Sequence, residues 1–112
     1  MDSKYRTPDV LIKVRFLLSK EGGRETNVDG TTFDYGCPIN IDGQYFDCRF
    51  IGNEKKSFNL GEWHDIYIKF LSSELAMPHF TVGKHISLWE GKVIAEGIVV
   101  KNLNDVNSQC EN

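Results

Sequence analysis

Apolar and polar residues alternate with a period of two along several stretches of the chain. The longest stretch covers residues 10–18, and shorter ones cover residues 45–51 and 66–70. Such alternation predicts β-strands, because successive side chains of a strand point to opposite faces. Each of these segments is therefore expected to bury one face and to expose the other.

Two apolar runs near the end of the chain, residues 85–89 and 93–100, lie on either side of Glu90-Gly91. This arrangement predicts two strands joined by a tight hairpin, in which glycine supplies backbone angles that other residues resist. Residues 25–43 instead carry turn residues, such as Asp42-Gly43, between short apolar pieces. We expect a long loop there, with or without a short hairpin.

Five or six strands without a longer helical period indicate an all-β domain. The expected fold is a single small closed antiparallel β-barrel of about six strands, because closing a sheet removes its aggregation-prone edges. A β-sandwich is the alternative. The barrel is expected to comprise residues 10–102, between a flexible N-terminal segment at 1–9 and a flexible, mainly polar C-terminal tail at 103–112.

The composition fits one globular domain, since 40% of the 112 residues are hydrophobic and 26% are charged, with a formal net charge of −3. This acidic balance disfavours a broad phosphate-binding face, because nonspecific nucleic-acid affinity comes from clustered Lys and Arg. No apolar run is long enough to span a bilayer, and the first residues lack a secretory h-region. The three cysteines favour reduced thiols over disulfides. We expect a cytoplasmic protein without a membrane partner.

Three segments carry a likeness to a known family: Glu21-Gly22-Gly23-Arg24 after the first strand, Leu60-Gly61-Glu62 before the third, and residues 80–84 followed by 89–99. In order and spacing they resemble the C-terminal (third) β-barrel domain of bacterial elongation factor Tu. The resemblance implies a six-stranded antiparallel barrel, which in the elongation factor contacts the GTPase domain, tRNA and the exchange factor. Residues 29–45 depart from the family pattern, which weakens the transfer of contacts made there.

The chain contains no Gly-x-x-x-x-Gly-Lys-Ser/Thr loop. Such a loop cradles nucleotide phosphates through its backbone N–H groups. We therefore expect a stand-alone barrel that binds no nucleotide, hydrolyses no GTP and carries no cofactor.

Gly22, Gly23 and Arg24 are candidate binding residues, because in the family this turn lies near the tRNA-facing side. A double-glycine turn also suits a tight barrel corner, which is the structural alternative. Glu96 lies where the family has a small residue close to the RNA backbone, and a carboxylate there would repel phosphate. Lys92 is one of several lysines that either gather on one face or merely protect strand edges.

Aromatic residues are the other candidates for contact with a partner. Trp63 and Trp89, together with Tyr45 and Tyr67, could anchor a protein interface or fill the barrel. Trp89 is out of phase with the apolar residues of its own strand, so we expect it to be at least partly exposed. The barrel ends and the final hairpin form the candidate interface.

No catalytic or metal-binding arrangement is expected. The histidines and cysteines do not occur at the spacings that bring zinc ligands together. Cys48 lies on the apolar face of its strand, so we expect it in the core and not as a nucleophile. The carboxylates considered for acid–base chemistry are expected to be ordinary surface groups: Asp9, Asp47, Glu62 and Asp65.

These observations favour a non-catalytic protein-binding module of the bacterial cytoplasm. Its partner would be a translation-related factor or a toxin that it neutralises, and its acidity suits a basic protein. The alternative is a tRNA- or RNA-binding barrel that retains the family's nucleic-acid face. The two differ in whether Arg24 and the lysines gather around Glu96 or opposite to it.

Overall fold

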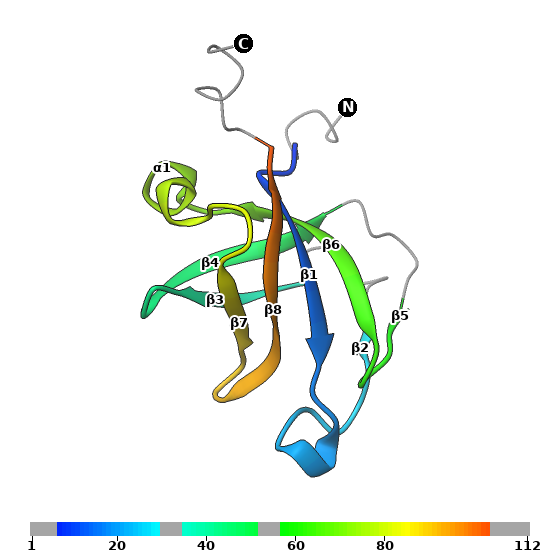
Figure 1. Ribbon diagram of the computed structural model, residues 1–112. Helices are drawn as coiled ribbons and strands as arrows, with labels where there is room; N and C mark the ends of the chain where they lie inside the picture. The colour runs from blue at the N-terminus through cyan, green and yellow to red at the C-terminus, as the bar shows by residue number, and fades with distance from the viewer. Residues whose placement is uncertain (1–6, 30–34, 52–56, 104–112) are drawn as a thin grey trace.

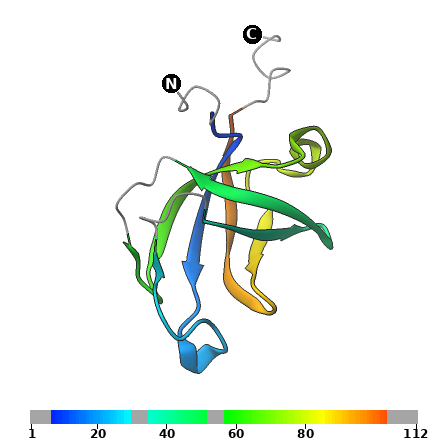
Figure 2. The ribbon, with the colours of Figure 1, turned by 180° about the vertical axis from the view of Figure 1, so that it is seen from behind.

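A closed β-barrel forms the body of the computed structural model, which describes residues 7–29, 35–51 and 57–103 (Figures 1 and 2). Its antiparallel strands follow one another around the barrel in the order β1-β6-β4-β3-β7-β8. They are β1 (Val10–Phe16), β3 (Gly36–Ile41), β4 (Gln44–Ile51), β6 (Trp63–Phe70), β7 (His85–Trp89) and β8 (Val93–Asn102). The expected all-β barrel is confirmed, and the sandwich alternative is wrong.

Shorter elements flank the barrel. Two of them, β2 (Val28–Asp29) and β5 (Ser57–Phe58), pair with each other beside it. One helical turn, α1 (Ser73–Ala76), lies near one end of the barrel (Figure 1). Within the described ranges, no helix has the length and apolar character needed to cross a membrane.

Parts of the expectation fall outside the described residues. These parts are most of the flexible segments predicted at 1–9 and 103–112, together with residues 30–34 of the predicted loop. The first barrel strand begins at Val10 and the last one ends at Asn102.

The second half of the predicted loop is a barrel strand, β3, which forms a hairpin with β4, so a long loop without a hairpin is wrong there. β3 buries Cys37, Ile39 and Ile41, and Asp42-Gly43 joins it directly to β4 with φ of 53° and 76°. Positive φ at both central residues is typical of the type I′ turn, whose twist matches that of the flanking strands. Pro38 made the segment look unlike a strand, because proline lacks a backbone N–H. In the structure β7 pairs only with Ile39 and Asn40 of β3, so the missing N–H of Pro38 interrupts no hydrogen bond to β7.

The inward faces of the strands fill the barrel. Its largest fully buried side chains on the strands are Phe16, Ile12, Ile39, Ile41, Ile66, Ile68, Leu88, Ile94, Val10 and Val14. Cys48 is 2% exposed, which confirms its expected place in the core, and its Sγ donates to the carbonyl oxygen of Cys37 at 3.3 Å. Phe80 follows α1 and packs on Phe70 with ring centroids 4.6 Å apart.

Asp9 is buried immediately before β1, so the prediction that it is a surface carboxylate is wrong. Its Oδ2 accepts hydrogen bonds from the backbone N–H of Phe70 at 3.0 Å and from the hydroxyl of Ser73 at 2.8 Å. The ammonium of Lys69 lies 3.7 Å away. A buried charge is costly unless it is bonded in this way. Asp9 therefore ties the start of β1 to the end of β6 and to α1.

Candidate binding groove on β3, β7 and β8

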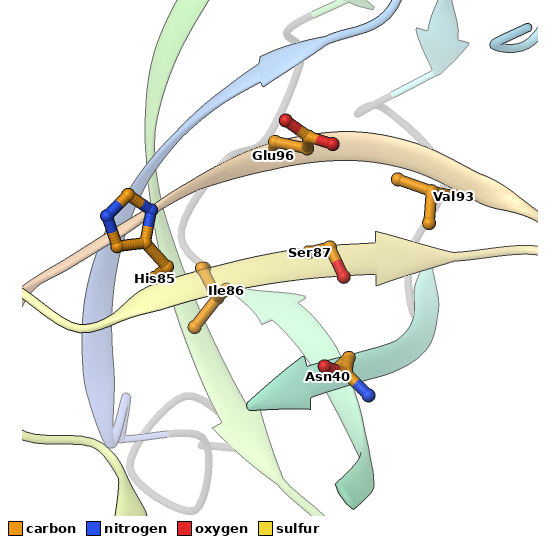
Figure 3. Close-up of a pocket in the computed structure, with 6 residues that line it drawn as sticks. All are labelled: Asn40, His85, Ile86, Ser87, Val93 and Glu96. Atoms are coloured by element: carbon orange, nitrogen blue, oxygen red, sulfur yellow. The ribbon is translucent and has the colours of Figure 1, made fainter. Parts of the chain in front are cut away.

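A shallow groove of about 240 Å³ lies on the barrel over strands β3, β7 and β8 (Figure 3). Its centre is a row across three adjacent strands, because Asn40 pairs with Ser87, and Ser87 pairs with Glu96. His85 and Val93 lie toward opposite ends of the groove (Figure 3). Ser87 has the shortest side chain of the row and lies between two longer ones, so it forms the floor.

An irregularity in β8 shapes one wall of the groove. Ile94 and Ala95 are both fully buried, which breaks the alternation, and the register with β7 shifts beside Trp89. A β-bulge of this kind redirects the side chains on either side of it. As a result Val93 and Glu96, although separated by two residues, both lie on the outer face.

Four polar side chains of the groove make no hydrogen bond or ion pair with any residue that the structure describes: Asn40, His85, Ser87 and Glu96. Some polar groups elsewhere on the barrel surface are bonded to one another, as Asp42 is to Lys84 and His79. Polar side chains that converge without bonding each other retain their full capacity to bind a ligand. The groove is therefore a candidate binding surface.

An aromatic pair borders the groove. The rings of Tyr45 and Trp89 are in edge-to-face contact, with centroids 5.6 Å apart and an interplanar angle of 66°. Tyr45 pairs with Asn40 across β3 and β4, which places it next to the central row. Trp89 is 37% exposed, so its predicted partial exposure is confirmed. Large apolar rings next to polar groups are typical of interface anchors.

The other predicted contact residues of this region are dispersed. Lys92 is exposed in the turn of the β7–β8 hairpin, where its carbonyl oxygen accepts the N–H of Glu90 at 2.8 Å. Trp63 is 58% exposed but begins β6, where it pairs with Arg15 of β1. Because β1 separates β6 from β8, and β4 separates β6 from β3, Trp63 does not border the groove.

The predicted contact turn at Gly22, Gly23 and Arg24 has a structural role in the barrel. Gly22 adopts a φ of 94°, which favours glycine, and a Cβ on Gly23 would lie only 2.3 Å from a backbone oxygen. Nη1 of Arg24 donates to both carboxylate oxygens of Glu90, at 2.8 and 2.7 Å. The hydroxyl of Tyr35 donates to the same carboxylate. Arg24 therefore binds this turn to the β7–β8 hairpin.

Burial and the neighbouring Glu90 carboxylate raise the pKa of Tyr35 well above its usual range. The phenol therefore stays protonated and acts as a donor at neutral pH. The Glu90 carboxylate therefore accepts hydrogen bonds from one cationic donor, Arg24, and one neutral donor, Tyr35. It is satisfied within the barrel.

The groove does not form a catalytic relay. Ser87, His85 and Glu96 are residue types that serve as nucleophile, base and orienting acid, yet no two of them are hydrogen-bonded. Cys48 is not an activated nucleophile either. The hydrogen bond between Cys48 and Cys37 and the burial of Cys48 raise the pKa of its thiol well above the usual value. In the described ranges, no three side chains of the ligating types gather to hold a metal ion.

Sequence reasoning identified Trp89 and Glu96 but missed Asn40, Ser87 and His85. Ser87 and His85 could have been predicted from the alternation of β7, because their side chains point to the same outer face as that of Trp89. Asn40 was not, because its segment was taken for a loop. No model of a known protein family matches the chain, and no curated protein matches it.

Proposed function

We propose that this chain is a non-catalytic binding module that engages a protein partner through the groove on β3, β7 and β8. The observation that carries the proposal is the coincidence of an exposed aromatic pair, Tyr45 and Trp89, with four polar side chains that have no partner among the described residues. Protein interfaces concentrate their binding energy in such aromatic anchors surrounded by polar groups.

Charge supports a protein partner over RNA. The one acidic side chain of the groove, Glu96, is unpaired among the described residues, whereas several basic side chains of the barrel are held by carboxylates. Arg24 binds Glu90, Lys84 binds Asp42, and Lys13 lies 3.8 Å from Asp65. Among the described residues that line the groove, His85 is the one basic side chain. A phosphate backbone would meet repulsion there and little compensating attraction.

The place of the module in the cell is also part of the proposal. The resemblance to the C-terminal barrel of elongation factor Tu supports a role in the bacterial cytoplasm, with a translation-related factor or a neutralised toxin as the partner. A closed barrel is what that resemblance implies. Many families share small barrels, so the groove is the stronger support for the proposed binding function.

The experiment is affinity capture from bacterial lysate with the tagged full chain, its Trp89→Ala variant and the matched Trp63→Ala variant. Both tryptophans are exposed, at 37% and 58%, but only Trp89 borders the groove. We expect a stoichiometric protein that resists ribonuclease, is retained by Trp63→Ala, and binds Trp89→Ala about 30-fold more weakly, as loss of an aromatic hot spot implies.

Two results would overturn the proposal. Retention of RNA alone, lost with ribonuclease or with moderate salt, would replace it with the nucleic-acid alternative. Loss of the captured protein in Trp63→Ala but not in Trp89→Ala would move the interface to the opposite side of the barrel.

A further inference from the structure

The groove carries an excess of hydrogen-bond acceptors and an uncompensated negative charge. The carboxylate of Glu96 only accepts, and Asn40 and Ser87 each add an oxygen. Arg15 pairs with Glu96 across β1 and β8, but its guanidinium is held by both carboxylate oxygens of Glu21. A donor-rich cation is the ligand that this combination favours.

The spacing of the row distinguishes between arginine and lysine as the basic side chain that could bind there. Adjacent strands lie about 4.8 Å apart, so the backbones of β3 and β8 are roughly 10 Å apart with β7 between them. Asn40 and Glu96 extend from the outer two strands, and Ser87 leaves the middle low. A planar guanidinium with five donors can contact both walls at once, whereas an ammonium acts as a compact point charge.

The aromatic border points to the same ligand. Trp89 and Tyr45 present exposed rings beside the row. Guanidinium groups stack on aromatic faces, and their carbon stems pack on apolar surface. Val93, which is 37% exposed and lines the groove, offers that surface.

We infer that the groove binds the guanidinium group of an arginine side chain presented by the protein partner. In this arrangement Glu96 accepts two of its N–H donors, Asn40 and Ser87 accept others, and Trp89 stacks against its plane. The inference rests on the proposed function, since it names the chemistry by which the same groove recognises that partner. The net charge of −3 adds a long-range attraction for a basic protein.

The test is an amide-shift titration of the ¹⁵N-labelled full chain with N-acetyl-arginine methylamide. The matched probe is N-acetyl-citrulline methylamide, which has nearly the same shape but no charge. We expect saturable shifts at Asn40, Ser87, Glu96 and the indole N–H of Trp89 with the arginine probe only. Replacing the carboxylate by an amide, in Glu96→Gln, should weaken this binding about tenfold, as loss of a charged hydrogen bond implies. The Trp63→Ala variant should bind as the wild type does.

Equal shifts with the citrulline probe, shifts confined to residues outside the groove, or no shifts at tens of millimolar arginine probe would each overturn the inference. The capture experiment separates this failure from failure of the proposed function. If the partner is lost in Trp89→Ala but fully retained in Glu96→Gln, the groove binds a protein but does not recognise an arginine side chain. A partner retained in both variants removes the groove itself.

Discussion

Replacement of Arg24 by alanine tests whether the glycine turn is a contact site, as the sequence allowed, or a structural joint, as the geometry indicates. In the wild type, one nitrogen of Arg24 lies 2.8 and 2.7 Å from the two oxygens of Glu90, and the two side chains are 23% and 31% exposed. Arg24→Ala removes this link between the turn and the β7–β8 hairpin while leaving Tyr35 bonded to Glu90.

The expected loss of stability follows from the partial exposure of the pair. Hydrogen bonds to charged groups contribute about 1.5–3 kcal/mol when well shielded, whereas exposed ion pairs contribute about 0.2–1 kcal/mol because water screens them. A pair of intermediate exposure should therefore have a coupling energy of about 1 kcal/mol. The whole truncation should lower the free energy of unfolding by about 1–2 kcal/mol, and the Tm by roughly 4–8 °C for each kcal/mol lost.

The assay is urea unfolding of Arg24→Ala, Glu90→Ala and the double variant, combined as a double-mutant cycle. Lys13→Ala is the control, because the Lys13–Asp65 pair is long, at 3.8 Å, and its side chains are 48% and 62% exposed, so we expect almost no loss. A coupling energy near zero, together with loss of the captured partner in Arg24→Ala at unchanged stability, would refute the reasoning and make Arg24 a contact residue.

Three further predictions concern the barrel itself. Gly97→Ala should destabilise by about 3 kcal/mol or more in urea unfolding, because its Cβ would lie 1.9 Å from the backbone oxygen of Lys13; a loss below about 1 kcal/mol would contradict the close approach. Hydrogen bonds from Lys84 and His79 hold the pKa of Asp42 below its usual value of 3.8, so its stabilisation is present above that pH and is lost as the pH falls through the lowered pKa. The Tm difference between wild type and Asp42→Asn should therefore vanish on acidification, and a constant difference from pH 6 to about pH 2 would contradict this. Cys48 should resist alkylation in the folded protein at neutral pH and react only in denaturant, as peptide mass mapping would show, because its raised pKa and 2% exposure keep the thiol protonated and inaccessible.

The alternation of side chains was enough to predict most of the barrel strands. In β1, β4 and β6 apolar residues recur at every second position, β7 and β8 are apolar runs on either side of Glu90-Gly91, and each of these segments is a strand in the structure. Local pattern suffices here because a strand buries one face regardless of which strand lies beside it. The exposure of Trp89 followed from the same phase argument and is confirmed.

β3 was missed because its own residues are ambiguous. Gly36 and Pro38 are rare inside strands, and only the neighbours β4 and β7 make this segment extended. Without β3 the sequence could not place Asn40 next to Ser87, so the central row of the groove was also hidden.

The sequence by itself determined the fold class, the hairpin and the residue types available for binding, because these depend on periodicity and composition. The tertiary structure alone decided which of those residues meet. Barrel closure brings Arg24 to Glu90 and Asn40 to Ser87, although each pair is far apart in the chain. Whether a polar side chain is consumed by an internal partner or left for a ligand depends on such long-range contacts, which no local pattern encodes.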